Sequence, residues 1–394
     1  MNHRLGQVAM AVTLAVAGIF LLEMPAARAC NVPVFRFALE RWPSDNYVLV
    51  IAHDSPLAPA HRQAVDKLAA SSWDQNGKAN LTVQVLDLAA TPDDPAVEHL
   101  PLDRTTLPAA FLFYPAGFGT PTLVWQAALT ADNLRRLTHS PVRDDFVTRM
   151  TSGTTAVWLL LDSGDPATDD RAEQVLRESL ASIQQELELP PGVIHPSGEV
   201  TGSGSQAVDN GYFDRENQLE SGIPLKIAFD VIRIPAAAPA EDVLLGMLLH
   251  TAPGLLEKRT QPMTFPLFGR GRMLKPLVGG EIQTDAIAAI ASYLCGPCSC
   301  QVKALNPGVD LLLEEDWETR LAGVSAIQER ELPPLSGTAA VTGETIAAPE
   351  AGAPSTAPAP TPGIRPVVRN IGWMVVALGV LVIAATIKIK GGKQ

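Results

Sequence analysis

The chain is poor in basic residues and cysteine, and several catalytic motifs are missing. It has 30 Lys and Arg against 42 Asp and Glu, a net charge of −12. This balance argues against nucleic acid and anionic lipid as partners of the body. The sequence holds no Walker loop, no Gly-x-Ser-x-Gly and no His-Glu-x-x-His, so it offers no motif for P-loop, serine-hydrolase or zincin chemistry. The seven histidines show no paired metal spacing.

Residues 1–29 have the pattern of a secretory signal. Arg4 supplies the early positive charge, an apolar run extends from Val8 to Leu22, and Ala27-Arg28-Ala29 places small residues at the cleavage site. Cleavage there makes Cys30 the first mature residue. The charged Arg28 fits a lipoprotein signal poorly, which disfavours lipidation of Cys30.

The C-terminal region predicts a membrane anchor on a tether. Residues 332–370 are rich in Ala, Pro, Gly, Thr and Ser, which is typical of an extended, semi-rigid linker. Residues 371–387 carry no charge and are long enough to span a bilayer core. Export of the body places residues 388–394 in the cytoplasm. We therefore expect a single-pass membrane protein whose soluble body lies in the periplasm or extracytoplasmic space.

Between these ends the pattern alternates strands and helices twice, which predicts an α/β fold of two modules, residues 30–150 and 151–331. Each repeats the order strand, helix, strand, hairpin, helix. The expected strands are 47–52, 81–88, 109–114, 122–126, 155–161, 225–234, 263–268 and 272–278. The expected helices are 61–70, one capped by Thr130, one capped by Thr168, 241–249 and one capped by Thr284.

This order resembles the thioredoxin-like superfamily. The resemblance implies two tandem thioredoxin-like domains, with cis-prolines before each hairpin at Pro108 and Pro262. The chain departs from the family because no cysteine stands between the first strand and first helix of either module. Those loops read His53-Asp54-Ser55-Pro56 and Asp162-Ser163-Gly164-Asp165. The usual thioredoxin position therefore cannot exchange disulfides.

A second resemblance rests on two short blocks, Cys30-Asn31-Val32-Pro33-Val34-Phe35 and Cys295 to Lys303. The chain resembles an uncharacterised family of exported, membrane-anchored bacterial proteins. That likeness implies no activity.

The remaining cysteines form a cluster, Cys295-Gly296-Pro297-Cys298-Ser299-Cys300. The first interpretation is structural, with Cys30, Cys295, Cys298 and Cys300 paired as disulfides in an oxidising compartment. The second is a zinc or copper site of Cys295, Cys298 and Cys300. The third is redox chemistry by the same three thiols. Cys295 follows a predicted helix, whose carbonyl end disfavours a thiolate.

The favoured function is non-catalytic and needs no cofactor: a binding or scaffold protein, accessory to a membrane complex. Arg270 and Arg272, at a predicted hairpin tip, are candidates for gripping an acidic partner. His53 beside Asp54 is interpreted as a structural pair. An exported thiol–disulfide oxidoreductase using Cys295 and Cys298 is the first alternative, and a thiolate metal-binding protein is the second.

Overall fold

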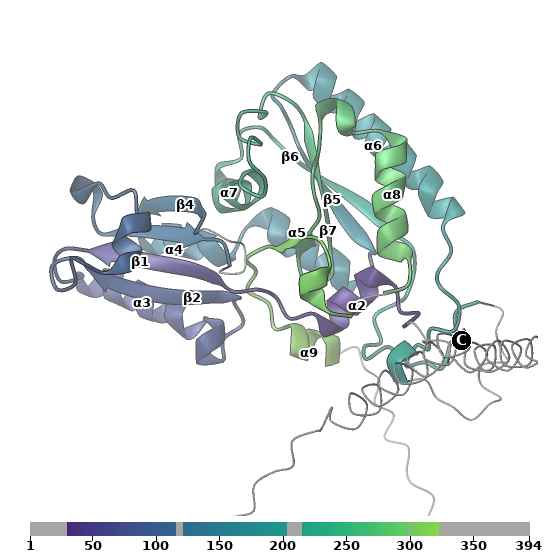
Figure 1. Cartoon of the computed structure of the whole chain (residues 1–394), viewed down its shortest axis with the longest axis horizontal. Coiled ribbons are helices and arrows are strands. Elements are labelled where there is room, and N and C mark those ends of the chain that lie inside the picture. The colour runs from purple at the N-terminus through teal and green to yellow at the C-terminus, as the bar shows by residue number, and fades with distance from the viewer. Residues whose placement is uncertain (1–29, 116–120, 203–214, 299–300, 323–394) are drawn as a thin grey trace, which may run out of the picture. The chain divides into compact units, whose positions relative to one another are not determined.

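Two β-sheets organise the residues that this computed structural model describes, 30–115, 121–202, 215–298 and 301–322 (Figure 1). All of them belong to one compact unit. The predicted signal peptide, linker, transmembrane segment and cytoplasmic tail lie outside the described residues. Within the described ranges, no helix is both long and apolar enough to cross a membrane.

The first sheet has the strand order β2-β1-β3-β4. Strand β1 is parallel to β2 and antiparallel to β3, and β3 is antiparallel to β4. The bounds are β1 Tyr47–His53, β2 Leu81–Asp87, β3 Ala109–Phe113 and β4 Leu123–Ala128. The four strands lie where the sequence predicted them. Strands β1 and β3 are buried on both faces, which explains their continuous apolar runs.

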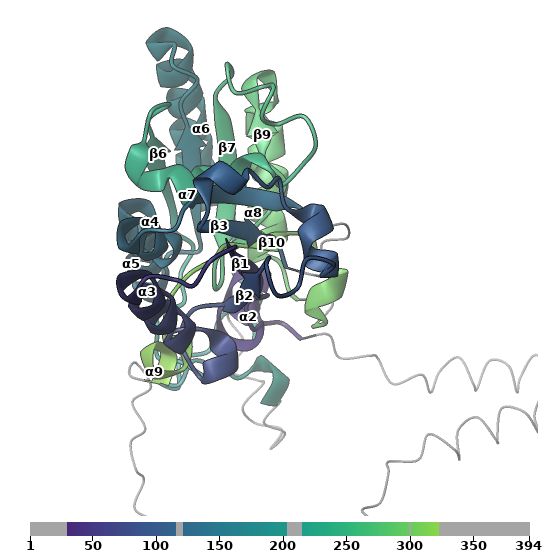
Figure 2. The same cartoon turned by 90° about the vertical axis from the view of Figure 1, so that its left-hand side faces the viewer.

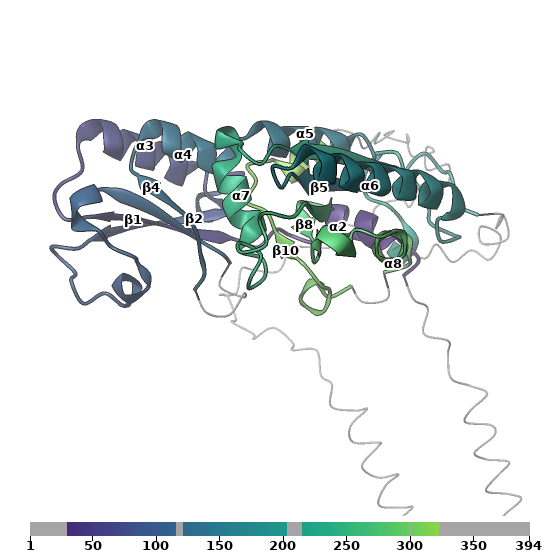
Figure 3. The ribbon, with the colours of Figure 1, turned by 90° about the horizontal axis from the view of Figure 1, so that it is seen from above.

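Helices cover one face of this sheet and short turns cover the other. The face with Leu49 packs against α3 (Pro59–Ala70) and α4 (Ala131–Thr138). Figures 2 and 3 show α3, α4 and α5 (Pro141–Thr151) on the same side of the strands. The opposite face is covered by the segment that contains the 3₁₀ turns η2 (Pro95–His99) and η3 (Arg104–Thr106).

The second sheet repeats the arrangement. Strand β5 is parallel to β6 and antiparallel to β7, which pairs with β8 and β9, and β8 pairs with β10. Helices α6 and α8 cover one face, and α7 covers the other. The bounds are β5 Ala156–Leu161, α6 Pro166–Glu186, β6 Phe229–Ile234, α7 Asp242–Leu249, β7 Met263–Phe268, β8 Arg272–Met273, β9 Leu277–Val278, α8 Thr284–Cys295 and β10 Val309–Asp310.

Three predicted details are wrong. Helix α6 is capped by Asp165, whose carboxylate accepts the Ala167 N–H at 3.2 Å, because Pro166 at the first helical position starts the helix earlier than Thr168. The predicted strand 272–278 is two short strands. Helix α8 begins at Thr284, but its N-cap is Gln283. By contrast, Thr130 caps α4 as predicted, accepting the Asn133 N–H at 3.1 Å.

The first helix of the described residues packs on the second sheet. Helix α2 (Val34–Arg41) buries Phe35 and Phe37 in a cluster with Phe268 of β7 and Leu294 of α8. Its buried Arg36 forms a 2.9 Å ion pair with Glu40. The same guanidinium also donates to the Ser221 and Ile223 carbonyls, which fixes α2 to the second half of the chain.

One apolar core is continuous across both sheets. Leu49 of β1 and Leu159 of β5 belong to the same buried cluster. Helix α7 of the second half packs on β4 of the first, and the indole N–H of Trp125 donates to Asp242 Oδ2 at 2.9 Å. The two predicted modules therefore share buried contacts with each other.

Candidate functional site: the junction pocket

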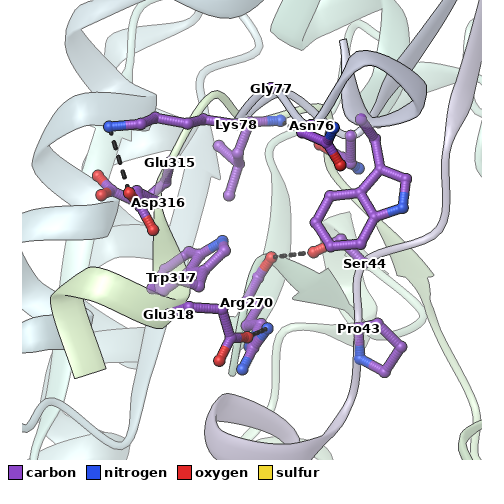
Figure 4. Close-up of a pocket in the computed structure, with 13 residues that line it drawn as sticks. Pro43, Ser44, Asn76, Gly77, Lys78, Arg270, Glu315, Asp316, Trp317 and Glu318 are labelled. Atoms are coloured by element: carbon purple, nitrogen blue, oxygen red, sulfur yellow. Dashed lines mark hydrogen bonds and ion pairs between the residues drawn. The ribbon is translucent and has the colours of Figure 1, made fainter. Parts of the chain in front are cut away.

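A cavity of about 360 Å³ opens where four segments of the chain meet, and we name it the junction pocket (Figure 4). The α2–β1 connection contributes Pro43, and the turn after α3 contributes Trp73. The β7–β8 hairpin tip contributes Arg270. The start of α9 (Trp317–Ala322) contributes Trp317. The volume lies within the range of small-molecule and peptide-side-chain pockets, about 300–1,000 Å³.

The turn after α3 has a backbone that fixes one wall of the pocket. Asn76 has φ 59°, a left-handed conformation that asparagine tolerates better than most residues. A Cβ on Gly77 would lie 2.1 Å from the carbonyl carbon and oxygen of Ser71, so no side chain fits there. The turn presents Trp73, which is 56% exposed, at its start.

The floor is held by hydrogen bonds between this turn and the C-terminal segment. Asn80 Oδ1 accepts the Leu313 N–H at 2.8 Å, and Asn80 Nδ2 donates to the Leu311 carbonyl at 3.1 Å. The Glu315 N–H donates to the Lys78 carbonyl at 3.0 Å. Because β10 of the same segment pairs with β8, residues 309–315 connect the two sheets beneath the pocket.

The charged groups around the pocket are paired with one another. Figure 4 shows Lys78 reaching Asp316, at 3.3 Å, and Arg270 reaching Glu318, at 2.9 Å. Glu315 is paired with Arg320 at 2.7 Å. The Thr319 N–H donates to Asp316, which lowers the pKa of that carboxyl and caps α9. The pocket is thus lined by balanced charge.

The two arginines predicted to face a partner are engaged within the chain. The side chain of Arg272 is 6% exposed and forms a 3.1 Å ion pair with Asp310, and it also donates to the Asn306 carbonyl at 2.7 Å. Arg270, 10% exposed, donates to the carbonyls of Leu39 and Glu40. A short turn between packed strands buries these side chains, so Arg272 is not presented to a partner. Arg270 reaches the pocket wall.

The described cysteines are all buried, and they lie in two places. Cys30 and Cys298 share one apolar cluster, and the Cys298 N–H donates to the Val32 carbonyl at 2.9 Å. Cys295 ends α8 as predicted, and burial raises the pKa of its thiol to about 12. Desolvation is therefore the cause that disfavours its thiolate. No disulfide joins Cys30, Cys295 and Cys298 to one another, and Cys300 lies outside the described residues.

The prolines before the two hairpins differ. The Leu107–Pro108 peptide bond is cis, and Pro108 directly precedes β3. No other cis bond occurs in the described ranges, so the bond before Pro262 is trans and the prediction for that residue is wrong. The N–H of Gly279 donates to the Pro262 carbonyl at 2.8 Å. His53 ends β1 with its ring Nδ1 buried and without a hydrogen bond, so the predicted pairing with Asp54 is not formed through that atom.

No group of three or more His, Cys, Asp or Glu side chains is arranged to hold a metal ion within the described ranges. Cys300, the third ligand of the predicted zinc or copper site, lies outside them. The thiolate metal site therefore stays a prediction. The buried thiol of Cys295, with its raised pKa, would have to ionise to take part in such a site.

Sequence reasoning missed the two tryptophans that matter most at this site. The side chain of Trp317 is largely buried, yet it also lines the pocket. Trp73 stands alone in the polar run Ser71 to Asn80, which is rich in turn-forming residues. An isolated aromatic in such a run is the signal that would have pointed to an exposed indole.

Comparison with known proteins gives no family assignment. No protein-family model matches the chain, and no curated protein sequence matches it.

Proposed function

We propose that this chain is a membrane-anchored, extracytoplasmic binding or scaffold protein that serves as an accessory to a membrane complex. Its body would consist of two tandem thioredoxin-like domains without catalysis at the usual thioredoxin position. The repeated strand order of the two sheets supports the domain proposal. The junction pocket is the observation that carries the binding function.

The pocket favours recognition over catalysis for two reasons. Its charged side chains are already paired, and the structure places no nucleophile with an adjacent base among its lining residues. It also combines a cavity with an exposed indole, that of Trp73. Protein–protein interfaces concentrate their binding energy at such aromatic residues and pockets.

We further propose that the cysteines serve as structural cross-links. The bridge between Pro33 and Pro297 is flanked by two backbone hydrogen bonds, so neither proline needs an N–H there. This short ribbon holds the segment that begins at Cys30 beside the segment that contains Cys298. A disulfide between these two segments would link the mature N-terminus to the residues that follow α8.

Site-specific photocrosslinking tests the binding function. A photoreactive amino acid replaces Trp73 in the full-length, membrane-inserted protein. The matched control carries it at Leu256, which is 53% exposed and does not line the pocket. We expect one defined adduct with an integral membrane protein, formed from position 73 alone. Equal labelling from both positions, or none from either, would overturn the proposal.

A redox assay tests the alternative. A thiol–disulfide oxidoreductase would reduce insulin, and Cys298→Ser would abolish that activity. We expect the purified full-length protein to show none above the thiol background. Turnover that depends on Cys298 would replace the binding proposal with the enzymatic one.

A further inference from the structure

Apolar surfaces and unpaired donors together define what the junction pocket can hold. Trp73, Pro43 and Trp317, the first residue of α9, all line the pocket. Figure 4 shows the nitrogen-bearing edge of the Trp317 indole directed into the cavity. The walls thus present flat apolar faces with an N–H group between them.

The ion pairs argue against a charged ligand. An anion would compete with Asp316 for Lys78 or with Glu318 for Arg270. A cation would compete with Arg320 for Glu315. Because each exchange breaks an existing pair to form another of the same kind, charge brings little net affinity. The pocket therefore favours a neutral group.

Three donors of the pocket remain available. Among the described residues, the indole N–H groups of Trp73 and Trp317 and the amide of Asn76 form no hydrogen bonds. An indole N–H donates and cannot accept. The nearby amide of Asn80 is engaged at both its oxygen and its nitrogen. A matching ligand would supply acceptors to these donors.

We propose that the junction pocket binds an extended, proline-rich segment of a partner protein. This proposal rests on the binding function above and names its ligand class. A polyproline II segment presents apolar rings, exposes carbonyl acceptors and lacks N–H groups at its prolines. It is also pre-ordered, and aromatic-lined grooves are the usual receptors for it. A glycan could also stack on indole, and it is therefore the competing ligand in the test.

Calorimetric titration of the full-length protein in detergent tests the ligand class. The probe is an acetylated and amidated peptide of five Ala-Pro repeats, and a matched peptide of five Ala-Gly repeats is the control. We expect saturable binding of the first peptide alone. A soluble chitooligosaccharide is titrated in parallel. Binding of that sugar, without the proline peptide, would overturn the proposal.

Two variants locate the binding. Trp73→Ala removes an exposed side chain, and we expect at least about tenfold weaker binding of the proline peptide, equivalent to about 1.4 kcal/mol. Trp317→Phe keeps an aromatic ring without the N–H, and a loss of several-fold is expected. Leu256→Ala, also at an exposed apolar residue, should leave binding unchanged. Equal binding by Trp73→Ala and the parent protein would remove the junction pocket as the site.

The titration and the crosslinking separate the two proposals. A specific adduct from position 73 without binding of the proline peptide rejects the ligand class and keeps the binding function. Absence of both rejects the two together.

Discussion

Gly246 of α7 lies against the carbonyl group of Val124 in β4, so close that a Cβ at Gly246 would stand 2.2 Å from that oxygen. Real Cβ atoms do not approach so near. This contact lets a helix of the second half approach a strand of the first. The missing side chain is therefore a requirement of the shared core.

Gly246→Ala should destabilise the protein, although alanine favours a helix more than glycine does. The helix must move away from β4 and disturb the packing of Val243 and Met247, at a cost of about 2 kcal/mol. Chemical denaturation of the full-length protein in detergent measures the change. The control is Gly280→Ala, where nothing lies within 4 Å of the added carbon. A neutral Gly246→Ala would show that the two halves are not rigidly packed.

Arg143 is a fully buried cation that holds carbonyl groups together. Its guanidinium donates to the carbonyls of Leu137, Leu312 and Arg136, and burial lowers its pKa to about 10. Arg143→Met would leave these acceptors unsatisfied, so we expect a loss of about 3 kcal/mol or more in the free energy of unfolding.

The matched control for that variant is Arg135→Met, because the Arg135 side chain is 67% exposed and its partner is the nearby Asp132. It should change stability by less than about 0.5 kcal/mol. Similar losses in both variants would contradict the role assigned to Arg143.

Alkaline pH should weaken the fold through Cys295, in the presence of a reductant. The pKa of its thiol is raised from 9.0 to about 12. The buried neutral thiol therefore contributes its full stabilisation of the folded state below pH 9. This contribution is lost as the pH rises toward 12, because the thiol of the unfolded chain ionises first. Near pH 10.5 the loss is about 2 kcal/mol.

Urea unfolding at several pH values, with Cys295→Ala beside the parent chain, measures this contribution. Burial also raises the pKa of Tyr47 and Tyr114, so stability should fall in both proteins. The slope should be smaller in the variant. Identical slopes would show that Cys295 does not titrate as a buried thiol.

The cysteine cross-links can be counted by mass. We expect the exported protein, alkylated under denaturing conditions without reductant, to carry fewer than four labels, and Cys30 to be recovered in a disulfide-linked peptide. Cys30 is also buried, at 3% exposed, which leaves no room for a lipid on its sulfur. Four labels, or a lipid-sized mass on Cys30, would contradict this arrangement.

Local patterns predicted most of the strands and several helices. The apolar runs at β1 and β5 carry their own signal, since strands buried on both faces need uninterrupted hydrophobic residues. Helix α5 was missed although Ser140 and Pro141 are a usual helix start, with the Ser140 side chain accepting the Arg143 N–H. The helix was not recognised because its apolar residues form only a weak amphipathic pattern.

The sequence by itself determined the succession of most strands and helices along each half and the absence of cysteine from the loops at His53 and Asp162, because periodicity and residue identity are local properties. The tertiary structure decided where distant segments meet. It placed α2 on the second sheet and closed the junction pocket from four separate parts of the chain. It also turned Arg272 inward. Such contacts depend on which buried surfaces fit together across more than two hundred residues, and no window of sequence contains that information.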